Sequence, residues 1–122
     1  MVEVNETDTV AELSECFVAY DQALLSNDVD ALDRWFWASP FAVRYGIGEE
    51  LHGHDAIAAH RRTRSGPIIR GPITRRTITT FGRDAATVCV EFDGNGRQTQ
   101  TWIRVDDEWR IVCAHVSLRQ AS

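Results

Sequence analysis

The stretch of sequence that decides the fold is ATVCVEFDGNGRQTQTWIRV, at residues 86–105. Two runs rich in β-branched and aromatic side chains, 86–92 and 97–105, flank the turn residues DGNG at 93–96. Asp-Gly and Asn-Gly pairs favour the type I′ turn, in which both central residues need a positive φ. The stretch therefore predicts two long antiparallel strands joined by a tight turn.

Further strands are predicted on both sides of this hairpin. One covers Ile73–Phe81, and another runs from Trp109 to Leu118 after a turn at 106–108. Two short strands, at 41–45 and around 50–52, come earlier in the chain. The second half of the sequence thus predicts a meander of antiparallel strands.

The first half predicts three helices. Between residues 8 and 25, apolar side chains recur in steps of three and four, the spacing of one helical face. Asn27 is expected to end this helix in the left-handed conformation, and Asp28 to cap a second helix that extends through Trp37. A third helix is predicted over 55–64. Helices followed by strands predict an α+β fold, with a pocket between the curved sheet and the first helix.

Length and composition exclude several classes of protein. The chain has 122 residues and a net charge of −5, which suits one domain over 1–122, with frayed ends expected at 1–7 and 119–122. No apolar run reaches the roughly 20 residues of a membrane span, and the acidic N-terminus is unlike a signal peptide. A cytoplasmic location is therefore expected, with no membrane partner. The three cysteines are expected to be reduced, partly buried thiols.

The basic residues are unusual in kind and in distribution. All 13 are arginine, so Schiff-base chemistry and a Walker-type phosphate loop, which need a lysine, are excluded. Residues 1–60 hold 2 arginines and 12 acidic side chains, whereas residues 61–122 hold 11 arginines and 6 acidic ones. Because most of these arginines occur at strand-like spacing among threonines, a solvated sheet edge is favoured over a nucleic-acid surface. Twelve arginines are expected to face solvent or to pair locally.

Tyr20 and Arg44 are the first candidates for chemistry. Tyr20 lies on the apolar face of the first helix and is either a core aromatic residue or a hydrogen-bond donor or general acid in the pocket. Arg44 lies in an otherwise apolar strand, on the face opposite Val43 and Tyr45. It is either exposed or buried with an anionic partner, for which a substrate carboxylate would serve.

The last strand supplies further candidates for the pocket. His115 and Ser117 continue a series of every second residue that begins with Trp109, Ile111 and Cys113. All five are therefore expected on the same, inward face of the strand. His115 is then either a satisfied core histidine or a polar residue of the pocket.

Two glutamines on the neighbouring strand, Gln98 and Gln100, share a face with Trp102. A two-residue turn at 106–108 would align that face with His115, and a three-residue turn would not. The sequence leaves this open.

A metal site and a dinucleotide site are both disfavoured. His52, His54 and His60 resemble a ligand set, but helical spacing places His54 and His60 on roughly opposite sides of the third helix. The glycines at 46, 48 and 53 lack the strand–turn–helix context of a dinucleotide fingerprint. No metal and no cofactor are therefore expected.

Several motifs in fixed order resemble those of the AtzH-like family, which includes the oxalurate-catabolism protein HpxZ. They are FWASP at 36–40, VRYG at 43–46, TTFGRD at 79–84, GRQTQTW at 96–102, WRIV at 109–112 and AHVSL at 114–118. The resemblance spans roughly residues 10–118. It implies an NTF2-like (SnoaL-like, cystatin-like) cone of three helices in a curved antiparallel sheet, and a homodimer formed through the outer sheet face.

The resemblance also implies an activity. AtzH-type members act in cyanuric acid breakdown as decarboxylating amidohydrolases that convert 1,3-dicarboxyurea to allophanate. The family's proposed catalytic tyrosine and arginine correspond to Tyr20 and Arg44. The chain departs from the family at His52, His54 and His60, where aromatic residues are expected, and at Phe41, which replaces a polar residue. These departures bear on the identity of the substrate.

Three functional hypotheses follow. The first is a small metal-free enzyme acting on an N-carboxylated urea or related ureide, with Tyr20 and Arg44 as catalytic residues and His115, Ser117, Gln98 and Gln100 as binding residues. The second is a non-catalytic ureide-binding or amidohydrolase-accessory protein. The third is an isomerase or dehydratase, which needs an inward carboxylate. Asp21 and Asp33 are the nearest in sequence, but the spacing places neither clearly on an inward face.

Overall fold

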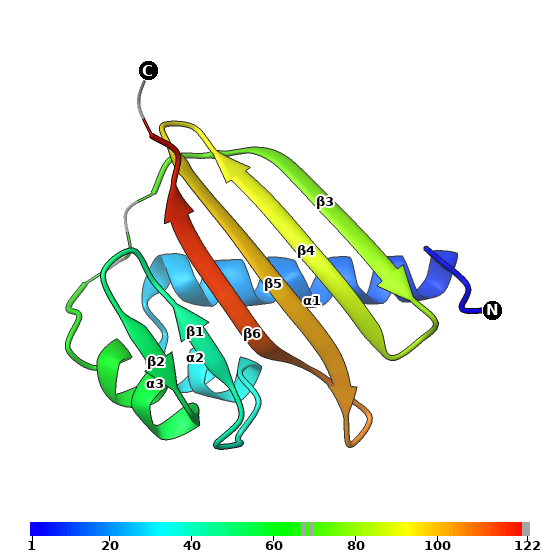
Figure 1. Cartoon of the computed structure of the whole chain (residues 1–122), viewed down its shortest axis with the longest axis horizontal. Helices are drawn as coiled ribbons and strands as arrows, with labels where there is room; N and C mark the ends of the chain where they lie inside the picture. The colour runs from blue at the N-terminus through cyan, green and yellow to red at the C-terminus, as the bar shows by residue number, and fades with distance from the viewer. Residues whose placement is uncertain (67, 69, 121–122) are drawn as a thin grey trace.

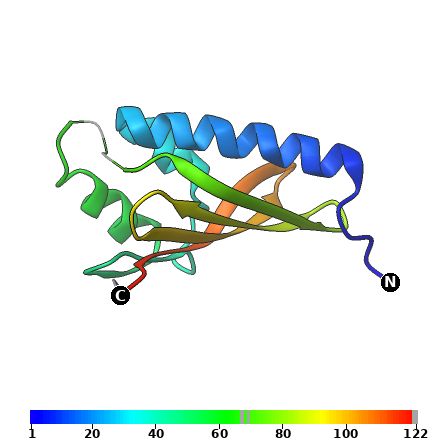
Figure 2. The ribbon, with the colours of Figure 1, turned by 90° about the horizontal axis from the view of Figure 1, so that it is seen from above.

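A curved sheet covers one side of a long N-terminal helix (Figures 1 and 2). The computed structural model describes residues 1–66, 68 and 70–120. In this part of the chain the helices are α1 (Thr7–Ser26), α2 (Val29–Trp35) and α3 (His54–Arg61). The strands are β1 (Val43–Tyr45), β2 (Glu50–His52), β3 (Ile73–Phe81), β4 (Ala85–Phe92), β5 (Gly96–Val105) and β6 (Glu108–Leu118). The α+β architecture predicted from the sequence is confirmed.

The boundary between the first two helices follows the predicted capping. Asn27 ends α1 with φ 54° and ψ 45°, the left-handed conformation. The Asp28 side chain accepts a hydrogen bond from the Ala31 backbone N–H at 3.2 Å and so caps α2. This helix ends at Trp35, earlier than predicted, because Phe36 adopts extended backbone angles and forms a β-bridge with Ile111.

The sheet is mixed, whereas an antiparallel sheet was predicted. Its strand order is β2-β1-β6-β5-β4-β3, and β1 pairs with β6 in parallel. The pairs from β6 to β3 are antiparallel, as the predicted meander requires. The parallel pair arises because β1 comes long before β6 in the chain and joins it through no hairpin, so no turn sets its direction.

The turn at 93–96 differs from the predicted conformation. At 93–96 only Gly94 has a positive φ, of 93°, so the turn is not the predicted type I′. The turn between β5 and β6 instead has positive φ at both central residues, 50° at Asp106 and 64° at Asp107. Val105 pairs directly with Glu108, so this turn has two residues.

A β-bulge in β6 then reverses the predicted orientation of the strand's C-terminal half. Trp102 pairs with Ile111, but Thr101 pairs with Cys113, so Val112 is an extra residue on β6. Because side chains alternate between the two faces of a strand, one extra residue exchanges the faces beyond it. Trp109, Ile111 and Ala114 are buried as a result.

The core fills the space between the concave face of the sheet and the helices. It includes Leu13, Phe17 and Tyr20 from α1, Leu32 from α2, Ile57 from α3, and Val88, Val90, Trp102, Trp109 and Ile111 from the sheet. Burial of large apolar side chains of this kind stabilises a fold by roughly 1.5–3 kcal/mol each before entropy is counted. The outer face of the sheet, by contrast, carries the exposed thiols of Cys89 and Cys113, which were expected to be partly buried.

The N-terminal residues that were predicted to be frayed are attached to the sheet. The Asn5 backbone N–H donates to the Thr80 carbonyl at 3.0 Å, and the Gly82 N–H donates to the Glu3 carbonyl at 2.7 Å. At the other end, the Arg119 N–H donates to the Asn95 carbonyl at 2.7 Å. Residues 121 and 122 of the second predicted frayed end lie outside the described residues. None of the helices in the described residues has the length and apolar character of a membrane span.

Candidate functional site

A cavity of about 340 Å³ opens between the C-terminal end of α1 and the concave face of the sheet. Tyr20 and Leu24 line it from α1, Arg44 from β1, and Gln98 from β5. Its other lining residues are Ile47, Ile68, Arg70, Gly71, Phe92, Asp93, Gly96, Val116 and Leu118. The structure therefore brings Tyr20, Arg44 and Gln98, which are far apart in sequence, to one cavity.

Tyr20 is held rigidly at the inner end of this cavity. Its side chain is 3% exposed, and its ring lies 6.1 Å from that of Phe17, 6.5 Å from Phe36 and 6.2 Å from Trp102, centroid to centroid. The hydroxyl oxygen accepts a hydrogen bond from Nε2 of Gln98 at 3.4 Å. Since the oxygen acts as an acceptor here, the hydroxyl hydrogen remains to be donated to a ligand.

Arg44 faces the cavity because of its pairing with β6. It lies beside Ala114, which is buried, whereas its neighbour Tyr45 lies beside His115 on the outer face. The Arg44 side chain is 16% exposed, and its Nη1 donates to Oε1 of Glu49 at 2.9 Å. Arg44 is thus the buried guanidinium with an anionic partner that the sequence left as one alternative.

Glu49 links Arg44 to the third helix. Nε2 of His60 lies 3.5 Å from the same Oε1 atom that Arg44 contacts. Burial tends to raise the pKa of Glu49, but the hydrogen bond and the charge of Arg44 outweigh this and hold it below its ordinary value. Glu49 is therefore a carboxylate at neutral pH and neutralises Arg44.

A second arginine, Arg70, lines the cavity and was not singled out from the sequence. Its Nη2 donates to Oδ2 of Asp21 at 2.5 Å, and its guanidinium lies 4.9 Å from the centroid of the Phe92 ring. The partners are 49 positions apart, so no local spacing rule points to this pair. The sequence does offer one signal for this pair. Asp21 directly follows an inward tyrosine, and a carboxylate in that position needs a cation nearby.

Arg61 lies behind the cavity and is also buried, at 3% exposure. Nη1 of Arg61 donates to Oδ1 of Asp33 at 2.6 Å, and the guanidinium lies 5.1 Å from the centroid of Phe36. Burial lowers the pKa of Arg61 despite the nearby Asp33 carboxylate. Arg61 and Arg70 therefore contradict the expectation that every arginine except Arg44 faces solvent or pairs locally.

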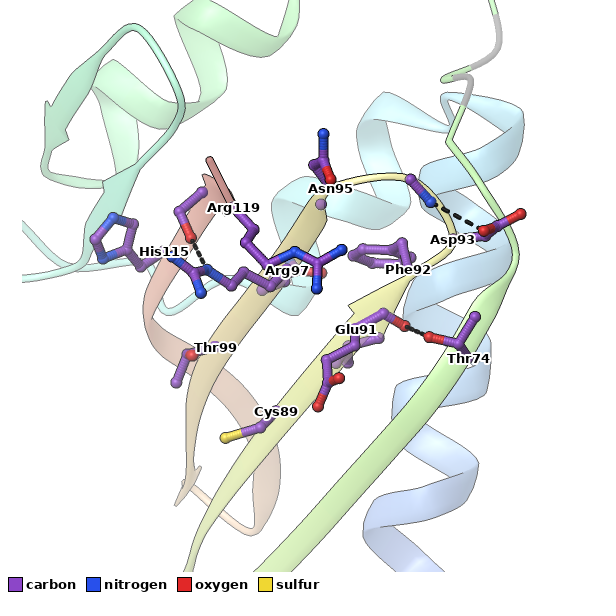
Figure 3. A pocket seen from close by; sticks show the side chains of 15 residues that line it. Thr74, Cys89, Glu91, Phe92, Asp93, Asn95, Arg97, Thr99, His115 and Arg119 are labelled. Atoms are coloured by element: carbon purple, nitrogen blue, oxygen red, sulfur yellow. Dashed lines mark hydrogen bonds between the residues drawn. The ribbon is translucent and has the colours of Figure 1, made fainter. Parts of the chain in front are cut away.

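His115 and Ser117 do not line this cavity. Beyond the bulge they lie on the outer face, where His115 is exposed and pairs with Thr99, and where the Ser117 hydroxyl accepts a hydrogen bond from Nε of Arg97 at 3.0 Å. Figure 3 shows His115, Thr99 and Cys89 on this outer face, where they line a separate hollow. The expectation that His115 and Ser117 point inward is wrong, because the bulge at Val112 exchanges the faces.

The two glutamines do face inward, on the side opposite to His115. Gln98 is 6% exposed and Gln100 is fully buried. Gln98 reaches the cavity, whereas Oε1 of Gln100 accepts a hydrogen bond from Nε1 of Trp102 at 2.9 Å and Gln100 is not among the residues that line the cavity. The two-residue turn would have aligned both glutamines with His115, and the bulge cancels that alignment.

Comparison with known proteins places this arrangement in a family. A family model described as AtzH-like matches residues 2–122. The chain belongs to the AtzH-like family. It has no match among curated proteins.

Two solved structures are similar to this AtzH-like chain in both sequence and fold. A cystatin-like fold protein from Burkholderia xenovorans LB400 is 45% identical, with 100% of each chain covered and a TM-score of 0.92. A protein with unknown function of the DUF3225 family from Pectobacterium atrosepticum SCRI1043 is 40% identical. The match covers 96% of this chain and 95% of that chain, with a TM-score of 0.86.

A more distant structure shows the fold class. An NTF2-like protein of unknown function from Pseudomonas putida KT2440 is 17% identical, with 95% of this chain and 90% of that chain covered and a TM-score of 0.80. The cystatin-like, NTF2-like fold implied by the sequence resemblance is thus confirmed.

His52, His54 and His60, the histidines of this AtzH-like chain considered as a ligand set, make separate contacts. His52 lies on the outer face, with its ring 6.0 Å from that of Tyr45. Nε2 of His54 lies 2.8 Å from the Asp33 carbonyl, and His60 contacts Glu49. Across residues 1–66, 68 and 70–120, no group of three His, Cys, Asp or Glu side chains is arranged to hold a metal ion.

The carboxylates considered for an isomerase are engaged elsewhere in this AtzH-like chain. Asp21 binds Arg70, and Asp33 binds both Arg61 and Arg62, the latter at 2.7 Å. Neither aspartate is among the residues that line the Tyr20–Arg44 cavity. The arrangement therefore offers a hydrogen-bond donor and a guanidinium to a ligand, rather than an unpaired carboxylate base from either of these residues.

Proposed function

We propose that the chain is a small enzyme that removes a carboxylate group from an N-carboxylated urea or a related ureide, as in the conversion of 1,3-dicarboxyurea to allophanate. The observation that carries this proposal is that Tyr20 and Arg44 line one cavity. Membership of the AtzH-like family supports it, since the motif resemblance implies that the family's proposed catalytic pair falls at these two positions.

Arg44 binds a carboxylate of the substrate in this proposal. A guanidinium holds a carboxylate through two parallel N–H···O bonds, and the low exposure of Arg44 strengthens these bonds. In a substrate with two carboxylates, Arg44 holds the one that remains in the product. Holding the departing carboxylate would oppose the reaction, because only interactions that strengthen in the transition state accelerate it.

Tyr20 acts on the nitrogen that loses its carboxylate. When the C–N bond breaks, its electron pair stays on nitrogen and the carboxylate leaves as carbon dioxide. The nitrogen gains a proton, which the Tyr20 hydroxyl donates and later recovers from water. Gln98 is a positioning residue in this scheme, because it donates to the Tyr20 oxygen and leaves the hydroxyl hydrogen directed to the ligand.

The cavity suits a substrate of this kind in size and polarity. At about 340 Å³ it lies at the small end of the ligand pockets found in proteins. A donor such as Tyr20 and an electrostatic contact such as that of Arg44 each contribute roughly 10²–10⁴-fold to a rate. That range is adequate for an N-carboxylate, which loses carbon dioxide spontaneously.

The test is to incubate purified protein with enzymatically generated dicarboxyurea and to follow the formation of allophanate and carbon dioxide. We expect Tyr20→Phe and Arg44→Ala each to lower kcat/KM by roughly 10²-fold or more. Tyr45→Phe and Arg97→Ala are matched controls, since both residues lie on the outer face. A wild-type rate no greater than that of the Tyr20 and Arg44 variants would exclude the proposed activity.

A binding or accessory role is the alternative outcome of this experiment. In that case the ureide binds in an Arg44-dependent way but is not turned over, and an added amidohydrolase partner gains activity. The same four variants separate this outcome from catalysis, because the Tyr20→Phe variant would then retain the effect on the partner.

A further inference from the structure

The partner of Arg44 is itself a carboxylate, which is the same chemical group that the proposed substrate presents. Glu49 lies in the turn between β1 and β2, and its Oε1 is 2.9 Å from Nη1 of Arg44. The Glu49 side chain is 28% exposed, against 16% for Arg44. A ligand carboxylate that uses Nη1 of Arg44 therefore has to take the place of Glu49 there.

The turn that carries Glu49 is built to let its side chain fold back. A Cβ atom placed on Gly46 would lie 1.8 Å from Oε1 and 2.4 Å from Cδ of Glu49. The Glu49 carboxyl group therefore lies directly over the backbone of Gly46, where any other residue would displace it. Ile47, at the tip of the same turn, lines the cavity although it is 64% exposed.

We propose that Glu49 is an internal carboxylate that occupies Arg44 in the free protein and that a substrate carboxylate must displace. Glu49 thus lowers the affinity for all ligands of Arg44, and only a carboxylate that binds Arg44 more strongly than Glu49 does is retained. In the free protein Nε2 of His60 also lies 3.5 Å from Oε1 of Glu49. This inference rests on the proposed function, since it assumes that Arg44 binds the ligand carboxylate.

Two different substitutions test the displacement. Glu49→Gln removes the competing charge. Gly46→Ala leaves that charge in place but puts a methyl group where the Glu49 carboxyl group lies, and the backbone of Gly46 is not in the left-handed region, so alanine is compatible with it. The atoms that must move for Gly46→Ala belong to the end of a flexible side chain, so little strain is expected.

The chain offers a matched control for each substitution. Glu50→Gln removes an exposed carboxylate one position further along, and Gly48→Ala adds a methyl group where no atom lies within 4 Å. The binding of malonate, a small stable dicarboxylate, is measured by titration calorimetry for all four variants, the wild type and Arg44→Ala. Thermal unfolding of each variant confirms that it folds.

We expect Glu49→Gln and Gly46→Ala to bind malonate about fivefold more tightly than the wild type, a gain that matches the loss of one partly exposed competing ion pair. Glu50→Gln and Gly48→Ala should bind like the wild type. With the ureide substrate, the first pair should lower KM and leave kcat unchanged.

Unchanged or weaker malonate binding by Glu49→Gln and Gly46→Ala would overturn the inference, because Glu49 would then support Arg44 rather than compete for it. Two other results would count against the proposed function. One is that Arg44→Ala binds malonate as tightly as the wild type, and the other is that neither the wild type nor any variant binds malonate. The two failures are therefore distinguishable.

Discussion

Replacing Asp33 by asparagine should lower the free energy of unfolding of the whole domain. Asp33 binds Arg61 at 2.6 Å, and the Arg61 side chain is only 4% exposed. Asp33→Asn keeps the shape of the side chain but leaves that guanidinium buried without a counter-charge. Breaking a buried pair on one side costs about 3–5 kcal/mol, since the remaining charge stays desolvated.

The loss should be large on the scale of the whole domain. A domain of this size has a free energy of unfolding of about 5–15 kcal/mol, so about 3 kcal/mol should lower Tm by roughly 10 °C. Urea denaturation at neutral pH measures the change. The double variant Asp33→Asn/Arg61→Met should recover most of the stability, because an apolar side chain of similar length then fills the site.

A neighbouring aspartate serves as the control. The Asp30 side chain is 86% exposed and 4.0 Å from Nη2 of Arg62, so Asp30→Asn should change stability by less than about 0.5 kcal/mol. If Asp33→Asn proves as stable as Asp30→Asn, the structural role assigned to Asp33 is wrong.

Two further predictions concern stability. The hydrogen bond from Arg104 holds the pKa of Glu12 below its ordinary value, and Nε1 of Trp109 also donates to this carboxylate. A lowered pKa contributes stability that is present above the ordinary pKa and lost as the pH falls through the lowered one. Glu12→Gln should therefore lose less Tm than the wild type between about pH 6 and about pH 3, and parallel curves would contradict this. Asp107 has a φ of 64°, so Asp107→Gly should raise the free energy of unfolding by about 0.5–1 kcal/mol in urea denaturation. A destabilised Asp107→Gly would show that the side chain outweighs the backbone strain.

The local features of the fold could be predicted from the sequence because they depend on neighbours in the chain. The apolar spacing of residues 8–25 predicted both the first helix and the inward position of Tyr20, which is 3% exposed. Asn27 and Asp28 act as predicted because capping needs only the adjacent backbone. Strict alternation likewise placed Arg44 opposite Tyr45, as the structure has it.

His115 and Ser117 were misplaced because the pairing of β6 with β5 interrupts the local alternation of faces along β6. Val112 is an ordinary strand residue by composition, and it becomes a bulge only because β5 and β6 pair as they do. That single residue moves His115 and Ser117 out of the cavity side while Gln98 stays within it. No pattern in 109–118 alone carries this information.

The charges around the cavity show the same limit. Arg70 binds Asp21, which is 49 positions away in the sequence, and Arg61 binds Asp33, which is 28 positions away. Neither pair is close enough in sequence for a helical or strand spacing rule to connect them. Glu49 is only five positions from Arg44, but its fold over Gly46 depends on the conformation of the turn.

The sequence by itself determined the elements, their order, the family, the inward face of Tyr20 and the position of Arg44 opposite Tyr45, because these depend on periodicity and on motifs in fixed order. Only the tertiary structure decided that β1 pairs in parallel with β6, that His115 faces outward, and that Glu49 occupies Arg44. Each of these depends on contacts between segments that meet only after folding. The physical reason is that contacts with other segments of the fold, and not neighbours in the sequence, set the face on which a strand's side chain lies and the partner of a charged side chain.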